Sequence, residues 1–403
     1  MSGLSAHQQR LIVLAVASQA SISIASWGLG ALGPDLAETF HLSAAGLGAI
    51  LAAGFIGNAI ILIPAGTLVD RAGPRLPLII GGLASGACLV LAGFAPTALL
   101  VGGALLLYGL TAAFVAVAGT VSVFHGFTPE RRGMALGFRQ MAVSAGGLIA
   151  AGLLPGLAAL GGIRLSLVVA GLLAAVFATL FGLASPPGAL HRGAPASRDV
   201  RGLFRVPSIW RVVAISAVHV SALTTVLNFS VPAVRDQGHS SLVGAVLFAV
   251  VSVSAMASRL FWGRVADLGR GTRRRRSLRD IGIVTVVGAL VFWVIAPQSP
   301  WLALPAMFVF AFGAMGANGV LYLIAGELAG PARAGQAVGL ISMVLFGVSG
   351  AVSPGLGAIA DALGYRSLWL CAAGFGVLSI VLTLGLPHDD PAPPDDVPSS
   401  PAP

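Results

Sequence analysis

Charged residues are scarce in this chain: they make up 9% of its 403 positions, and none of them is lysine. An average soluble domain carries roughly 25% charged residues. Hydrophobic residues reach 57%, and the mean hydropathy is +0.94. No soluble core buries so large an apolar fraction, so the composition excludes an ordinary soluble domain and indicates a protein surrounded by lipid.

Cysteine is almost absent, since only Cys88 and Cys371 occur, inside apolar runs and without metal-ligand spacing. We therefore expect packed thiols, no metal ion and no cofactor. The chain lacks a Walker motif, which excludes an ATP-driven pump on this chain alone. Its apolar runs hold no cluster of His, Asp or Glu, so we expect no enzyme. The net charge of +9 lies in short gaps between apolar runs, and we expect no nucleic-acid partner.

Twelve apolar runs are long enough to cross a bilayer, which takes about 20 mostly apolar residues per helix. The sequence therefore predicts an all-α membrane protein with twelve transmembrane helices. The predicted spans are Leu11–Leu32, Ala44–Leu68, Leu76–Phe94, Ala98–Phe124, Met134–Ala158, Ile163–Ala184, Val212–Val234, Leu242–Ala266, Leu278–Ala296, Trp301–Ile324, Ala337–Ala360 and Leu368–Leu386.

The only long polar connection divides these spans six and six, and it is rich in Pro, Gly and Arg. Such a segment is typical of a domain linker. We predict an N-terminal bundle over residues 1–185, a cytoplasmic linker over 186–210 and a C-terminal bundle over 211–387. The Pro-rich, acidic tail at 388–403 has little to bury and is predicted to be disordered.

Arginine is distributed unevenly between the two sides of the predicted membrane. With both termini on one side, 18 of the 23 arginines fall on that side and three, Arg164, Arg235 and Arg366, on the other. Short loops rich in basic residues stay cytoplasmic. The N-terminus shows no convincing signal-peptide cleavage site, so the first span is expected to remain. We expect a monomer in the cell inner membrane with both termini in the cytoplasm.

The two halves share sequence patterns, which predicts two parallel six-helix repeats. Alternating-access carriers build a central site between such repeats. The paired segments are TPERRGMALG at 128–137 with GPARAGQAVG at 330–339, PGLAAL at 155–160 with PGLGAI at 354–359, Arg164 with Arg366, and GTLVD at 66–70 with GRVAD at 263–267.

The segment GTLVDRAGPR at 66–75 resembles the loop signature of the major facilitator superfamily, and GRVADLGRGTR at 263–273 is a degenerate copy. With the span count and the central linker, this resemblance covers the whole chain. It implies that spans 1, 4, 7 and 10 line a central cavity and that spans 5 and 8 are neighbours across the halves. We interpret the loop as a conformational gate; a well-formed turn is the alternative. The gating candidates are Asp70, Arg71, Arg75 and Asp267.

Two arginines lie within spans: Arg139 in the fifth and Arg259 in the eighth. A charged group at a helix centre costs at least about 2.5 kcal/mol, so each is a candidate site residue. If the superfamily packing holds, the two guanidiniums approach each other, and a carboxylate substrate would relieve their repulsion. The alternatives are a tie to a loop or a helix end for Arg259, and snorkelling or pairing with Glu130 for Arg139.

The segment SRLFWGRVAD at 258–267 resembles the eighth helix of oxalate/formate antiporters and monocarboxylate carriers. In those families an arginine here contacts the substrate carboxylate, a role that the resemblance implies for Arg259. GFRQMAVSAGG at 137–147 is similar to a pattern of bacterial organic-anion carriers. The antiporters' basic residue in the eleventh span has no counterpart here, which argues against a dicarboxylate.

Other polar residues in the cavity spans are weaker candidates, because a single polar side chain is more often an interhelical hydrogen bond. His219 titrates in a useful range and is the best proton-site candidate, although exchange of one anion for another needs no such residue. These substrate-binding candidates are Gln19, Trp27, Tyr108, His219, Asn228, Asn318 and Tyr322.

The pattern as a whole predicts a secondary active transporter of a small organic anion, which we expect to be a monocarboxylate. Its expected partners are that substrate, the lipid bilayer and either a proton or a counter-anion. One rival is a drug or metabolite exporter of the same fold, although the proline motif of its fifth helix is incomplete here. A membrane sensor built on a transporter fold is a second rival, and it would need a signalling partner.

Overall fold

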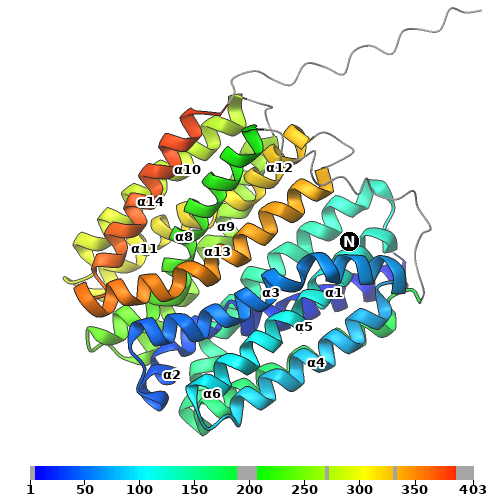
Figure 1. Cartoon of the computed structure of the whole chain (residues 1–403), viewed down its shortest axis with the longest axis horizontal. Coiled ribbons are helices and arrows are strands. Elements are labelled where there is room, and N and C mark those ends of the chain that lie inside the picture. Colours follow the sequence, from blue (N-terminus) through cyan, green and yellow to red (C-terminus); the bar gives the residue numbers. More distant parts are fainter. Residues whose placement is uncertain (1–4, 188–206, 268–271, 330–333, 387–403) are drawn as a thin grey trace, which may run out of the picture.

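The chain forms two bundles of helices packed side by side, shown in Figure 1 as blue to green for the first and green to red for the second. The computed structural model describes residues 5–187, 207–267, 272–329 and 334–386. No strand occurs in these ranges. Most of the predicted linker and the predicted tail lie outside them, so those two expectations remain predictions.

The helices of the first half are α1 (Ala6–Ser26), η1 (Leu29–Leu32), α2 (Gly33–Phe40), α3 (Ala44–Ala72), α4 (Arg75–Gly93), α5 (Ala98–Gly126) and α6 (Pro129–Ala184). Those of the second half are α8 (Pro207–Asp236), α9 (Ser241–Asp267), α10 (Thr272–Ile295), α11 (Pro300–Ala314), α12 (Ala317–Ala329), α13 (Ala334–Leu363) and α14 (Ser367–Leu384).

Hydroxyl side chains mark where several helices begin. The Ser5 hydroxyl accepts from the Gln8 amide and the Gln8 side chain accepts from the Ser5 amide, which makes a capping box. The Ser43 hydroxyl caps α3 by accepting from the Gly46 amide, and the Thr97 hydroxyl caps α5 by accepting from the Leu100 amide. Such caps satisfy amide groups that have no partner within the helix, so they fix the helix starts.

Within the described residues, eleven helices are long and apolar enough to cross a membrane. One of them, 50 residues over Ala135–Ala184, would be about 75 Å long as a straight helix, whereas the hydrocarbon core is about 30 Å thick. The backbone of α6 is non-helical at Gly161 and Gly162, where Gly162 has φ +68°. The chain reverses there, so α6 supplies the fifth and sixth spans and the protein has the twelve-helix fold.

The tenth span was predicted as one helix over Trp301–Ile324. In the structure it is interrupted, since α11 ends at Ala314 and α12 begins at Ala317. The amide of Gly316 donates to the Gly313 carbonyl at 3.1 Å, one residue short of the α-helical step. Trp262 of α9 packs on this turn, and a β-carbon at Gly316 would lie 2.4 Å from its ring. The indole therefore occupies the space that a continuous helix with a side chain at this position would need.

Two arginine contacts support the internal repeat. The Arg164 guanidinium lies over the Phe94 ring at 3.7 Å from its centre, and that of Arg366 over the Trp293 ring at 4.5 Å. Phe94 follows α4, and Trp293 is near the end of α10. The two halves thus make the same cation–π contact at corresponding places.

The halves meet closely at the end of the bundle that holds α2 and the start of α3, which we term the α2 end. A β-carbon at Gly30 would lie 2.1 Å from the Leu227 carbonyl oxygen, and one at Gly48 would lie 2.5 Å from that of Ser353. Figure 1 shows α3 and α13 close together near α2 and farther apart toward the end marked N. The two bundles are therefore joined at the α2 end and diverge toward the opposite end.

Candidate functional site

Arg259 of α9 reaches across the seam between the two halves. Its Nη1 donates to the Ser144 hydroxyl at 2.8 Å and to the Gln140 carbonyl oxygen at 3.4 Å, both in the first part of α6. The expectation that spans 5 and 8 are neighbours is thereby confirmed. None of the described ion pairs includes Arg259, so these neutral oxygens are its acceptors here.

Two aromatic residues lie beside this guanidinium. It is 5.5 Å from the centre of the Trp27 ring at the end of α1, and Tyr322 of α12 is also near it. The Tyr322 hydroxyl accepts a hydrogen bond from Ser342 of α13 at 3.3 Å. Residues from spans 1, 5, 8, 10 and 11 therefore converge around Arg259.

Arg139 points away from this cluster. Its guanidinium donates to the Thr120 hydroxyl at 2.8 Å and to the Ala116 carbonyl oxygen at 2.9 Å, both on α5. It is 5% exposed, and its Nε has no hydrogen-bond partner among the described residues. Arg139 and Ser144 are five residues apart, which places them about 140° apart around α6.

The predicted approach of the two guanidiniums is therefore wrong in this conformation. Arg139 is held inside the first half by acceptors on α5, whereas Arg259 alone crosses the seam. The predicted alternative, a pair between Arg139 and Glu130, depends on a side chain that lies outside the described part of the chain. A substrate contact for Arg139 remains a prediction that this geometry does not favour.

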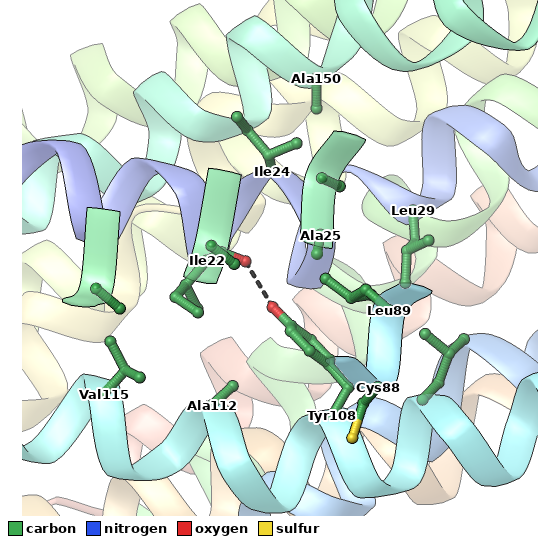
Figure 2. Close-up of a cluster of buried hydrophobic side chains, with 14 of the residues drawn as sticks. Ile22, Ile24, Ala25, Leu29, Cys88, Leu89, Tyr108, Ala112, Val115 and Ala150 are labelled. Carbon is green, nitrogen blue, oxygen red and sulfur yellow. Dashed lines mark hydrogen bonds between the residues drawn. The ribbon is translucent and has the colours of Figure 1, made fainter. Parts of the chain in front are cut away.

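Tyr108 and His219 are buried and bonded to neighbouring helices. The Tyr108 hydroxyl donates to the Ile22 carbonyl oxygen at 2.7 Å inside a cluster of apolar side chains (Figure 2). His219 Nε2 lies 3.1 Å from the Gly313 carbonyl oxygen, and each residue is 2% exposed. In this conformation both make interhelical bonds in place of the predicted substrate contact.

A Tyr108→Phe substitution tests this structural role. It removes one buried hydrogen bond, so we expect a loss of about 1 kcal/mol of stability with little change in transport rate. Thermal unfolding in detergent and transport in proteoliposomes measure the two effects. A large fall in transport at unchanged stability would restore Tyr108 as a substrate ligand.

The remaining substrate candidates differ in their surroundings. Asn228 is buried and its amide donates to the Ser353 hydroxyl at 2.9 Å, while the amide of Gln19 donates to Ser23 at 3.2 Å. Asn318 is half-buried and precedes the exposed Gly319, and its side chain makes no hydrogen bond to another described residue. Of this group, Asn318 shares α12 with Tyr322, one turn away, and therefore lies on the same helix face.

The predicted gate is only partly described. The side chains of Asp70 and Asp267 lie outside the described residues, and Arg71 is exposed. At the start of α10, Arg274 forms an ion pair with Glu327 of α12 and donates to the Ala266 carbonyl oxygen at 3.3 Å. The sequence analysis counted Arg274 only among the arginines of one side and did not predict this pair, which ties the start of α10 to the helix carrying Tyr322. The gating roles remain predictions.

Comparison with known proteins agrees with this architecture. The sequence profile of the Major Facilitator Superfamily matches residues 15–354. The chain belongs to this superfamily. Its members bind small-molecule substrates, sometimes with protons, and are not enzymes in general. The protein is therefore a multi-pass membrane transporter of the secondary kind.

Individual relatives of this Major Facilitator protein are distant. An uncharacterized MFS-type transporter of Mycobacterium tuberculosis, recorded in two strains, is 26% identical over 333 residues, which cover 81% of this chain and 73% of that protein. A D-xylose-proton symporter has a TM-score of 0.78 at 16% identity, covering 94% of this chain and 98% of its own.

Two further solved structures show the same architecture. The nucleoside transporter NupG has a TM-score of 0.76 at 16% identity, covering 94% of this chain and 99% of its own. A bacterial homolog of the human lysosomal transporter Spinster, in an inward-facing and unoccupied conformation, has a TM-score of 0.75 at 15% identity. The match covers 94% of this chain and 97% of its own. At these identities the likeness shows the fold alone.

Proposed function

We propose that this transporter carries a small organic anion, a monocarboxylate, by alternating access. The observation that supports the proposal is Arg259, a guanidinium in the seam that bonds to the opposite half through neutral oxygens only. A cation placed in a span without a resident counter-ion is costly. A carboxylate substrate offers two charged oxygens to the guanidinium fork and so compensates this cost.

The neighbours of Arg259 fit such a guest. The bond to Ser144 joins the two halves while the site is empty, and a carboxylate would compete for the same nitrogen. Trp27 and Tyr322 lie near the guanidinium, and we propose that their rings contact the organic part of a substrate. Because the ligands come from both halves, binding of the anion is coupled to their relative position.

Orientation and coupling follow from the same arrangement. Arg71 near the end of α3, Arg264 near the end of α9 and Arg274 at the start of α10 lie at the end opposite α2. We therefore propose an inner-membrane monomer that faces the cytoplasm in this conformation, with both termini inside. His219 is buried against the Gly313 carbonyl, which favours exchange of anions over coupling to a proton at that residue. A counter-anion is accordingly the proposed co-substrate.

Counterflow in proteoliposomes tests the substrate class. The proteoliposomes are preloaded with one unlabelled compound at a time, and uptake of the same compound in labelled form is measured. The panel comprises monocarboxylates, dicarboxylates, sugars, nucleosides and cationic drugs. We expect exchange with monocarboxylates only. Movement of cationic drugs with no carboxylate exchange would instead identify the exporter of the same fold.

Ser144→Ala probes the competition at Arg259. Removing the hydroxyl frees one guanidinium donor, so we expect the substrate concentration at half-maximal counterflow to fall about two- to threefold. Ser252→Ala is the matched control, because the Ser252 hydroxyl donates to Phe248 within its own helix at 3.0 Å. A rise in half-saturation for Ser144→Ala would show that Ser144 itself binds the substrate.

A further inference from the structure

Asp361 bridges the two halves at the α2 end. It lies two residues before the end of α13, and its carboxylate oxygens accept hydrogen bonds from the Ala44 and Ala45 amides at 2.7 and 2.8 Å. These amides open α3. A carboxylate of the second half therefore caps a helix of the first half.

The contact between the Asp361 carboxylate and the first amides of α3 is electrostatically favourable. The first amides of a helix have no partner within it and carry the positive end of the helix dipole. A carboxylate that accepts two of them forms charge-assisted bonds, which are about twice as strong as neutral ones. The contact therefore stabilises the state in which α13 lies against the start of α3.

The start of α3 does not depend on Asp361 for its fold. The Ser43 hydroxyl accepts from the Gly46 amide at 3.2 Å, so α3 keeps a cap of its own. At Gly357, one turn before Asp361, a β-carbon would lie 2.2 Å from the Ala44 carbonyl oxygen. The two backbones meet directly here, and the carboxylate can leave without unfolding the helix it caps.

We propose that Asp361 is a latch that holds the α2 end closed and is released and remade in each transport cycle. The proposal goes beyond the substrate class, because it depends only on the contact between α13 and α3. In an alternating-access carrier the α2 end must open, and opening separates the Asp361 carboxylate from the Ala44 and Ala45 amides. Weakening the latch shifts the population toward the state with an open α2 end.

Labelling of a buried cysteine measures that population without any substrate. Ser353→Cys is placed in a Cys88→Ser, Cys371→Ser background, since Ser353 is fully buried and its backbone faces Gly48 of α3 across the seam. The rate of maleimide labelling in lipid nanodiscs then reports opening of the α2 end. We expect Asp361→Asn, which keeps the shape and removes the charge, to raise this rate about tenfold. Asp361→Glu retains the charge, and its labelling rate is expected to lie between the rates of the parent and of Asp361→Asn.

Asp280→Asn is the matched control, because Asp280 is exposed and pairs with Arg279. It should leave the labelling rate unchanged. Size-exclusion chromatography and thermal unfolding verify that each variant is folded; Asp361→Asn is close to isosteric and the Ser43 cap remains. A labelling rate equal to that of the parent in folded Asp361→Asn overturns the latch. Failure of carboxylate exchange in the parent would remove the substrate proposal and leave this result intact.

Discussion

Replacing Arg259 with alanine is expected to lower monocarboxylate counterflow about 100-fold. Truncating one partner of a desolvated, hydrogen-bonded charge pair typically costs several kcal/mol, because the other charge is left without its counter-ion. Arg259 is the guanidinium that spans the seam between α9 and α6. Initial counterflow rates in proteoliposomes, normalised to folded protein, measure the change.

Two further variants make this result specific. Arg259→Lys keeps the charge and loses the planar fork, so we expect an intermediate rate. Arg264→Ala removes an exposed arginine from the same helix and should leave counterflow near the parent rate. Parent-like exchange by Arg259→Ala would remove Arg259 from the site and with it the anion proposal.

Gly30→Val is expected to reduce transport tenfold or more by preventing closure at the α2 end. A β-carbon at Gly30 would lie 2.1 Å from the Leu227 carbonyl oxygen, which is backbone and has little room to shift. Overpacking in a closely packed interface costs about 1–3 kcal/mol, and here that cost falls on the closed state alone. Counterflow together with labelling of Ser353→Cys measures both consequences.

Gly103→Val is the control for Gly30→Val, because a β-carbon at Gly103 meets no atom within 4 Å. It introduces the same side chain into a span without touching the seam. We expect unchanged transport and unchanged labelling. If Gly30→Val transports at the parent rate while folded, close contact between η1 and α8 is not needed in the cycle.

The two buried arginines show where sequence reasoning stops. Arg139 and Arg259 look alike in the sequence, each a single charge in an apolar run at similar depth. A helix turns by about 100° per residue, so the direction of a side chain depends on how its helix is rotated against its neighbours. That rotation directs Arg139 to α5 and Arg259 to the seam.

Asp361 was missed for a related reason. An acidic residue at the end of an apolar span is unremarkable, since charged groups are common at membrane boundaries. A sharper signal was available, because an aspartate follows the end of predicted span 2 by two residues, at Asp70, and the end of predicted span 11 by one, at Asp361. Matching the ends of spans 2 and 11 would have singled out both residues.

The sequence by itself determined the twelve crossings, the division into halves and the uneven distribution of arginine. The crossings follow from short-range physics, because a backbone in lipid must satisfy its hydrogen bonds within helices of about 20 apolar residues. The arginine distribution reflects the retention of basic loops in the cytoplasm. Only the tertiary structure decided that Tyr108 and His219 bond to neighbouring helices, that Arg259 and not Arg139 crosses the seam, and that Asp361 caps α3. A polar side chain in a span has the same sequence pattern whether it binds substrate or bonds to another helix. Its partner is set by the packing of helices that are distant in the chain.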